Sequence, residues 1–487
     1  MKNFVFNNFL KLENRKMKWC VIGILFINCV LLSVFFHIDV YFYDSGYYWS
    51  VADPVYTGKG FNLLSFPETY RGCLFPLLVL VSKIVFRGFW GWRIISAIMV
   101  TLIFGVFCPR LLKFHISSVK DGIKVIIAEL ICFYFWGYFF QFPLSDLPAT
   151  FFLIAGVFCI VVLQESFREG LLSDNIVLSQ WIKVIGMGGI AGVCFYAAYN
   201  CRVAFAYGAL LCVIIFSIRL IKEKKTRQLI CVIVGGIFGA LVISYPQCAI
   251  NLHNLGKFSP KVYTEAYTGY GANLQSTQVL WGLMYPRYET YVGDVNEYGA
   301  GGVYFIDKIG NRIIAVEGIS AENFKITDVF WIFIKHPFDT IGIYTRHLVA
   351  LVTPAWNQVY ITDIFNNKSL ILTVNIVVWF ILGIGICRKG ANIFNTANIG
   401  YVFSIILPAF LQMFGAPELR FFFPVYVMLY SSVCMKTNLS DVGSYVRKNW
   451  FVTVVVSAII IALWVTVFGD TLAMNKEMTL LINDNMR

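Results

Sequence analysis

The chain contains a long series of separate apolar runs, and this feature limits its fold more than any other. Most of the runs approach the length of about 20 residues at which a helix crosses a lipid bilayer. The 487 residues are 58% hydrophobic and 14% charged, with a mean hydropathy of +0.71, whereas soluble domains are about 45–50% apolar and about 25% charged. A transmembrane barrel would instead show short segments of alternating polarity. The sequence therefore predicts an all-α polytopic membrane protein.

Basic residues mark the loops that stay in the cytoplasm. They gather between residues 110 and 124, 219 and 227, and 435 and 448, and again at Arg388-Lys389. With these loops inside, we expect a cytoplasmic N-terminus and about eleven transmembrane helices. The expected helices cover about residues 19–38, 92–111, 123–141, 147–164, 183–199, 203–220, 229–246, 370–387, 399–415, 421–435 and 450–468.

Two further apolar segments are shorter than a membrane span. Counting residues 74–86 as a crossing would place the basic loop 110–124 outside, so we expect an interfacial or re-entrant helix on the outer side. Residues 341–352, which include Arg346 and His347, are interpreted in the same way.

These segments divide the chain into three parts. Residues 1–246 are predicted to form an N-terminal transmembrane module, whose first outer loop covers residues 39–91. Residues 247–369 are predicted to form an external module with an interfacial helix, because loops this long are rarely without structure. Residues 370–487 contain the C-terminal transmembrane helices.

Several other patterns have simpler explanations than function. The net charge of +12 comes from short loops and forms no basic stripe with interleaved aromatic residues, so nucleic acid is not an expected partner. Most of the 13 cysteines lie inside apolar runs and show no zinc-ligand spacing. Residues 186–191 match a loose dinucleotide-binding pattern, but inside a membrane helix such small residues favour close helix packing. Glu129 lies inside an expected span, where a local pair with Lys124 is the simple explanation.

Several charged residues meet on one outer surface under this topology. They are Asp44 after the first span, Arg71 before the 74–86 segment, Asp146 between the third and fourth spans, Arg202 between the fifth and sixth, and Glu418 and Arg420 between the ninth and tenth. The positive-inside rule does not favour external arginines near a membrane. Each of these arginines therefore needs a reason.

Structural explanations exist for single members of this set. Asp44 and Asp146 could terminate or start helices, and Asp146 stands just before Leu147-Pro148, a pattern typical of a helix start. An isolated arginine could bind lipid headgroups without specificity. Arginines and acids together on one face favour a binding or catalytic site instead.

Six motifs occur in an order typical of one enzyme family. "YDSGYYW" follows the first span, "RGCLFPLL" ends the first outer loop, and "SDLPATFFL" carries the second acid. The large loop opens with "PQCAINLHNLGKFSP" and later contains "HPFDTIGIYTRH", and "PELRFFFPVY" lies near the C-terminus. In this order, and over most of the chain, the sequence resembles the GT-C glycosyltransferases, especially the bacterial branch of the protein-mannosyltransferase-like superfamily that uses polyprenyl-phosphate sugars.

The resemblance implies roles for individual residues. Asp44 would be the catalytic base, and Asp146 would support the site or a metal ion. Arg71 and Arg420, with Arg202, would hold the lipid phosphate. The other predicted substrate contacts are Tyr47, Tyr48 and Glu418, of which Glu418 is expected to orient the neighbouring arginine.

Two motifs depart from relatives in this family. Ser45 stands where many relatives carry a second adjacent acid, which argues against a bound metal. Arg71-Gly72-Cys73 replaces the Lys-Pro-Pro motif of lipid-A aminoarabinose transferases, which argues against that subfamily. We therefore expect no required cofactor, and the alternative is a divalent metal ion held by Asp44 with Asp146 or Glu68.

The predicted reaction is transfer of a sugar from a polyprenyl-phosphate donor to a glycan, lipid or protein acceptor. A carboxylate can take the proton of the acceptor hydroxyl, and arginines match the leaving phosphate bidentately. Direct displacement with one base predicts inversion at the anomeric carbon. The expected location is the cell membrane, in contact with membrane lipids, with the active site on the extracytoplasmic face.

Two other functions fit the same outline. A transporter or flippase of lipid-linked sugars has a similar number of helices, but it should show two related halves and polar residues near the bilayer midplane. An O-antigen-type polymerase or ligase shares the outer-face, lipid-linked chemistry. Dependence on a lipid-monophosphate sugar, rather than on a lipid-diphosphate glycan, would separate it from the predicted enzyme.

Overall fold

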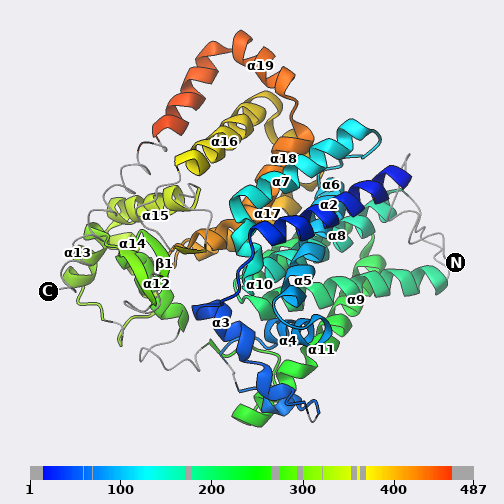
Figure 1. The fold of residues 1–487 in the computed structure, drawn as a ribbon, viewed down its shortest axis with the longest axis vertical. Coiled ribbons are helices and arrows are strands. Elements are labelled where there is room, and N and C mark those ends of the chain that lie inside the picture. The colour runs from blue at the N-terminus through cyan, green and yellow to red at the C-terminus, as the bar shows by residue number, and fades with distance from the viewer. Residues whose placement is uncertain are drawn as a thin grey trace.

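The structure is a computed structural model. It describes residues 15–58, 60–67, 70–169, 178–264, 274–292, 300–320, 322–352, 359–361, 369–462 and residue 465. A bundle of long helices makes up most of the molecule, and a group of shorter helices and strands stands at one side of it (Figure 1). The prediction of a helical membrane protein agrees with this architecture.

Seven helices in the described residues are long and apolar enough to cross a membrane. They are α2 (Arg15–Phe35), a continuous span made of α5 (Trp90–Leu102), a π-helical turn (Ile103–Phe107) and α6 (Cys108–Leu111), then α7 (Val119–Gln141), α8 (Asp146–Arg168), α9 (Leu178–Cys201), α10 (Phe205–Lys222) and α11 (Thr226–Leu255). All seven coincide with predicted spans. The 30 residues of α11 cover about 45 Å at 1.5 Å per residue, so this helix extends beyond a hydrocarbon core of about 30 Å.

The C-terminal part adds further apolar helices. α16 (Ser369–Lys389), α17 (Ile399–Gln412) and α18 (Phe423–Lys436) overlap three more of the predicted spans, and two 3-10 turns (Gly390–Phe394 and Thr396–Asn398) connect α16 to α17. α19 (Leu439–Lys448) is followed by a helix at Trp450–Ala462, and the pair is bent by 110°. If this pair counts as one span, up to eight helices meet the criteria of length and composition within the described ranges. The number is below the predicted eleven partly because α17 and α18 each have only 14 residues.

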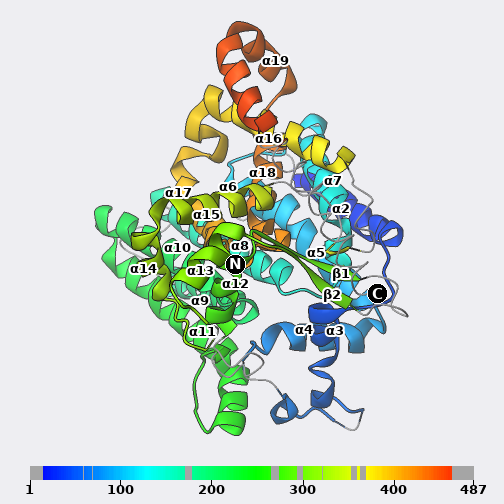
Figure 2. The same cartoon turned by 90° about the vertical axis from the view of Figure 1, so that its left-hand side faces the viewer.

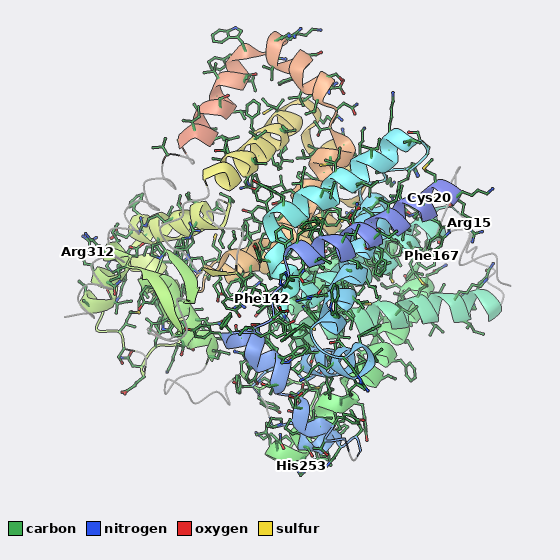
Figure 3. The ribbon with its side chains drawn as sticks, viewed as in Figure 1. Arg15, Cys20, Phe142, Phe167, His253 and Arg312 are labelled. Atoms are coloured by element: carbon green, nitrogen blue, oxygen red, sulfur yellow. The ribbon has the colours of Figure 1, made fainter. Side chains whose placement is uncertain are left out.

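The basic helix ends collect at one end of the bundle. Arg110 in α6 pairs with Glu165 near the end of α8, with 2.5 Å between the charged atoms. Lys124 in the first turns of α7 donates to Asn438, just beyond α18, at 2.7 Å. These contacts require neighbouring helices to alternate in direction, as the charge pattern predicted. Arg15, at the start of α2, lies toward this basic end in Figure 3.

The short segment 74–86 forms α4 (Leu74–Phe86), and this helix does not cross the bundle. The Leu74 N–H donates to the Asn200 side chain near the end of α9 at 2.8 Å. After α4 a short turn leads into α5, whose Arg93 donates to the Ile38 carbonyl, beyond the end of α2, at 2.8 Å. Both ends of α4 therefore lie at the end of the bundle opposite the basic loops.

A small mixed module stands at that opposite end. It comprises α12 (Leu274–Met284), β1 (Arg287–Val292), β2 (Ala300–Phe305), α13 (Lys308–Val316), α14 (Asp328–Lys335), α15 (Pro337–Val352) and β3 (Tyr360–Ile361). Its own core includes Leu283, Ile313, Phe324 and Ile343. Figure 2 shows the module in front of the bundle, and Arg312 marks its outer edge in Figure 3.

This module also contains a three-stranded sheet, which the prediction of an all-α membrane protein did not include. β1 lies in the middle, pairs antiparallel with β2, and pairs parallel with β3. Both six-residue strands contain tyrosine and valine, residue types that are enriched in β-strands. The segment 341–352 forms the last 12 of the 16 residues of α15, a helix of this module.

Small residues bring α9 and α11 into close contact. A Cβ atom added to Gly192 would lie 1.9 Å from the carbonyl oxygen of Gly236, and one added to Gly188 would lie 2.5 Å from that of Val232. The loose dinucleotide-like pattern therefore lies on a helix-packing surface, as membrane helices with small residues allow.

Candidate active site

The charged residues that the sequence placed on the outer surface form one cluster in the structure. Their side chains come from α3 (Tyr43–Ser50), the loop before α4, the start of α8, the α9–α10 connection and a 3-10 turn (Leu419–Phe422) that leads into α18. The α3 helix belongs to the first outer loop, together with two 3-10 turns (Asp53–Val55 and Leu63–Ser65). Direct ion pairs connect all members of the cluster, which are Asp44, Arg71, Asp146, Arg202, Glu418 and Arg420.

Asp44 connects two arginines from distant parts of the chain. Its Oδ1 accepts a hydrogen bond from Nη2 of Arg71 at 3.0 Å, and its Oδ2 accepts one from Nη2 of Arg420, which is 376 residues away in sequence, at 2.8 Å. The start of α3 is capped by its neighbours, because the Ser45 hydroxyl accepts from the Phe42 N–H at 3.0 Å. The Asp44 carboxylate is thus not the helix cap. It lies in the first turn, where the helix dipole favours a negative charge.

Asp146 is the first residue of α8, but its side chain does not cap that helix. The carboxylate forms an ion pair with Nη1 of Arg202 instead. The Nε of Arg202 donates to Gln412 at the end of α17, and the guanidinium lies 3.9 Å from the centroid of the Phe421 ring. Asp146 therefore lies at a helix start, as the sequence indicated, but its carboxylate pairs with an arginine and does not cap the helix.

Arg420 is the centre of the cluster. Its Nε lies 2.6 Å from a carboxylate oxygen of Glu418 and 3.9 Å from Oδ2 of Asp146, while its Nη2 contacts Asp44. One guanidinium therefore approaches all three acids. The short Glu418 contact agrees with the expectation that this acid orients the arginine.

The formal charges of the cluster cancel, because three arginines face three acids. Asp44 is the most exposed acid, with 33% of its side chain accessible against 20% for Glu418 and 2% for Asp146. Burial alone would raise the pKa of Asp44, but the charges of Arg71 and Arg420 outweigh it and hold the pKa well below its usual value. Burial raises the pKa of Glu418, and the nearby Arg420 opposes this shift.

Aromatic rings surround Arg71. Its guanidinium carbon lies 4.6 Å from the ring centroid of Tyr47, 5.1 Å from that of Tyr48 and 5.7 Å from that of Tyr70. Ring faces attract a cation at such distances. Tyr47 and Tyr48 were predicted to contact substrate, and in the structure they contact this arginine.

A buried amide network fixes the backbone beside Arg71, and sequence reasoning missed it. The Asn200 side chain accepts from the Leu74 N–H at 2.8 Å and donates to the Gln247 side chain at 2.9 Å. The same Gln247 oxygen accepts from the Cys73 N–H at 3.0 Å. Gly72 lies so close that an added Cβ would be 1.9 Å from the Asn200 carbonyl oxygen. The backbone at Gly72 therefore leaves no room for a Cβ atom.

Tyr360 is a further residue near the cluster that the sequence analysis missed. It lies in β3 and is buried, and its hydroxyl accepts from the Ser45 N–H at 3.2 Å. Its ring stacks on Tyr43 at 6.3 Å and meets Phe142 edge-on at 4.7 Å. Burial raises the pKa of Tyr360 to about 12, so the phenol is neutral at pH 7. Tyr360 connects the sheet of the outer module to the helix that carries Asp44.

The acids of the cluster face arginines and not one another. Among the described residues no group of three or more His, Cys, Asp or Glu side chains could hold a metal ion. Divalent cations such as Mg²⁺ and Ca²⁺ need several oxygen ligands, whereas Asp44 and Asp146 direct their oxygens to arginines. Glu68, the other acid considered as a ligand, lies outside the described residues.

Comparisons with models of protein families, with curated proteins and with solved structures found no match.

Proposed function

We propose that the protein is a membrane glycosyltransferase that moves a sugar from a polyprenyl-phosphate donor to an acceptor hydroxyl, with Asp44 as the base. The observation that carries this proposal is the position of Asp44 between Arg71 and Arg420, at the end of the bundle opposite the basic loops. Displacement at an anomeric carbon needs a base next to groups that stabilise a leaving phosphate. The resemblance of the motifs to GT-C enzymes supports the same assignment.

In the proposed reaction, the acceptor oxygen bonds to the anomeric carbon while its proton passes to the Asp44 carboxylate. The bond between the anomeric carbon and the phosphate oxygen breaks, and its electron pair stays with the phosphate. The donor is a phosphodiester with one negative charge, and the product is a polyprenyl monophosphate with a charge of about −1.5 to −2. Arg71 and Arg420 stabilise this added charge. A single displacement inverts the anomeric configuration.

The surroundings of the cluster suit a donor with a lipid tail. Large apolar side chains cover the outward face of the bundle, as in α11, where Phe238, Leu241 and Tyr245 are 67%, 60% and 63% exposed. A polar cluster at the end of such helices would lie at the level of lipid headgroups. The proposal places this end on the extracytoplasmic side, because the basic loops gather at the other end. It also keeps eleven crossings, with α17 and α18 as short spans and the helix at Trp450–Ala462 as the last.

The cluster favours an enzyme over a transporter. Transporters bind substrate near the bilayer midplane, often at broken helices, whereas this set of ion pairs lies where helices begin and end. The polymerase or ligase alternative places its chemistry at the same end, so the donor must separate it from the proposed enzyme.

The test is sugar transfer by purified protein in liposomes, with a panel of polyprenyl-phosphate hexoses and pentoses as donors. Asp44→Asn keeps the shape of the side chain but cannot accept a proton at neutral pH. We expect turnover to fall roughly 10²–10⁴-fold, the usual contribution of a general base. The matched control is Asp53→Asn, which removes the same charge from the same outer loop, where Asp53 is 50% exposed and pairs with Lys83. The control should transfer sugar at the wild-type rate.

Two results would contradict the proposal. Turnover by Asp44→Asn within a few-fold of wild type would remove Asp44 as the base. Activity with lipid-diphosphate glycans and none with the monophosphate donors would favour the polymerase or ligase.

A further inference from the structure

The two arginines that would bind the leaving phosphate are already occupied by Asp44. Each oxygen of this carboxylate accepts from a different arginine, at 3.0 Å from Arg71 and at 2.8 Å from Arg420. A phosphate bound by the same two guanidiniums would also place one oxygen toward each of them. Asp44 and the phosphate therefore compete for the same N–H donors.

We propose that Asp44 occupies the phosphate site of the ligand-free protein and that the lipid phosphate takes over Arg71 and Arg420 from it. This inference rests on the proposed function and adds a condition to it. Asp44 becomes free to act on the acceptor only when a phosphate has taken its place on Arg71 and Arg420. The ligand class is a phosphate ester with a polyprenyl tail. This condition assigns Asp44 two roles, as base and as competitor of the phosphate.

The charges before and after transfer agree with this exchange. Before transfer, the cluster contains three arginines and three acids, so it has no net charge. During transfer, Asp44 gains a proton and loses its negative charge, and the phosphate gains about one negative charge. The total negative charge near Arg71 and Arg420 stays constant. Charge moves from the carboxylate to the phosphate, and neither arginine needs to move.

The two arginines are held in place by other groups, and Asp44 is the partner that can leave. The Nε of Arg420 forms an ion pair with Glu418 at 2.6 Å, which does not involve Asp44. The guanidinium of Arg71 lies among the rings of Tyr47 and Tyr48. The Asp44 side chain is the most exposed of the three acids. The electrostatics point the same way, since the low pKa of Asp44 in the ligand-free protein makes it a weak base until an anion shares its arginines.

Removal of the Asp44 carboxylate should increase the affinity for a phosphate, whereas removal of a group that binds the ligand would decrease it. The experiment measures the affinity of purified protein for farnesyl phosphate by calorimetry, with farnesol as the uncharged match. Asp44→Asn should bind farnesyl phosphate roughly tenfold more tightly than wild type, because it frees two guanidiniums from a competing anion. Farnesol should bind both proteins equally. Asp53→Asn, which removes a charge of the same outer loop at a distance from the arginines, should leave both affinities unchanged.

The outcomes separate this inference from the proposed function. Equal or weaker binding of farnesyl phosphate by Asp44→Asn, with clear binding by wild type, would overturn the competition and leave the glycosyltransferase proposal intact. No binding by either protein would overturn both. Asp44→Ala provides a second variant with the same expected sign, and thermal unfolding in detergent verifies that both variants are folded. A tenfold gain in both variants, lost again when Arg420→Ala is added, would support the exchange.

Discussion

Two regions of the molecule contain buried or partly buried acidic side chains, and the polar partners of these acids differ between the two regions. At the outer end, Asp44 and Asp146 each face an arginine. In the middle of α7, Glu129 is fully buried, and the Cys29 thiol donates to it at 3.1 Å. Within the described part of the chain no cation forms an ion pair with Glu129. The predicted local pair with Lys124 is wrong, because that lysine donates to Asn438 instead.

The difference shows where this protein can hold a charge. An isolated carboxylate in an apolar interior is so unfavourable that it keeps its proton, and acids inside membrane helices need partners to stay charged. Glu129, whose partners among the described residues are the Cys29 thiol and the Asn28 side chain, is therefore expected to be a neutral carboxylic acid. At the outer end, the charges of Arg71 and Arg420 hold the Asp44 carboxylate ionised. Chemistry that needs a carboxylate base is thus possible in the outer cluster and not at Glu129.

The largest effect should come from removing one arginine of the outer cluster. Arg202→Met leaves the 2% exposed Asp146 without its main partner, and breaking a buried pair in this way costs about 3–5 kcal/mol. Thermal or denaturant unfolding in detergent measures the loss. The double change Arg202→Met with Asp146→Asn should recover most of it, because no unpaired charge remains. Equal losses in the single and double variants would show that Asp146 is not held as a charged group.

A smaller effect is expected from the backbone that supports the cluster. A methyl group in Gly72→Ala would collide with the Asn200 carbonyl oxygen at 1.9 Å, and such overpacking costs about 1–3 kcal/mol. The change should also displace Arg71 and slow sugar transfer at least tenfold. Gly23→Ala in α2 is the matched control, because nothing lies within 4 Å of its added Cβ. Transfer at wild-type rate by Gly72→Ala would show that the position of Arg71 does not depend on this contact.

The smallest effect should come from the acid in the middle of the membrane. Glu129→Gln replaces a neutral carboxylic acid with a neutral amide of the same shape, so the free energy of unfolding should change by less than about 1 kcal/mol, the usual net value of one hydrogen bond. Sugar transfer should stay within a few-fold of wild type. A loss of activity comparable to that of Asp44→Asn would break the comparison, because the acid in the middle of the membrane would then take part in the reaction.

The sequence predicted the spans well because one physical quantity sets them. The thickness of the hydrocarbon core fixes the length of an apolar helix, so the runs from α2 to α11 stood out from their composition. The sheet had no such signal, since its strands are short and one of them, β3, has two residues. Its parallel pairing of Thr290 with Tyr360 joins segments that no local pattern connects.

The charged residues of the site were predictable for a related reason. Arginines that the topology predicts outside the membrane conflict with the positive-inside rule, and this conflict singled out Arg71, Arg202 and Arg420. The neutral residues that position these arginines conflict with no sequence rule, so there was no reason to select them from the sequence. The Tyr360 hydroxyl accepts from the Ser45 N–H, which is 315 residues away in the sequence. An asparagine or glutamine in an apolar helix does not indicate from sequence alone which backbone group it will bind.

The position of each arginine in the chain has a consequence for biosynthesis. Asp44 and Arg71 are translated within one outer loop, and Glu418 and Arg420 are separated by a single residue in another. Asp146 and Arg202 lie in successive outer turns, with α8 and α9 between them. With the cluster on the extracytoplasmic side, as proposed, each arginine would be translocated together with an acid of opposite charge, or soon after one. In that orientation the nascent chain would export the three arginines largely as neutral pairs, before the contact between Asp44 and Arg420 closes the cluster.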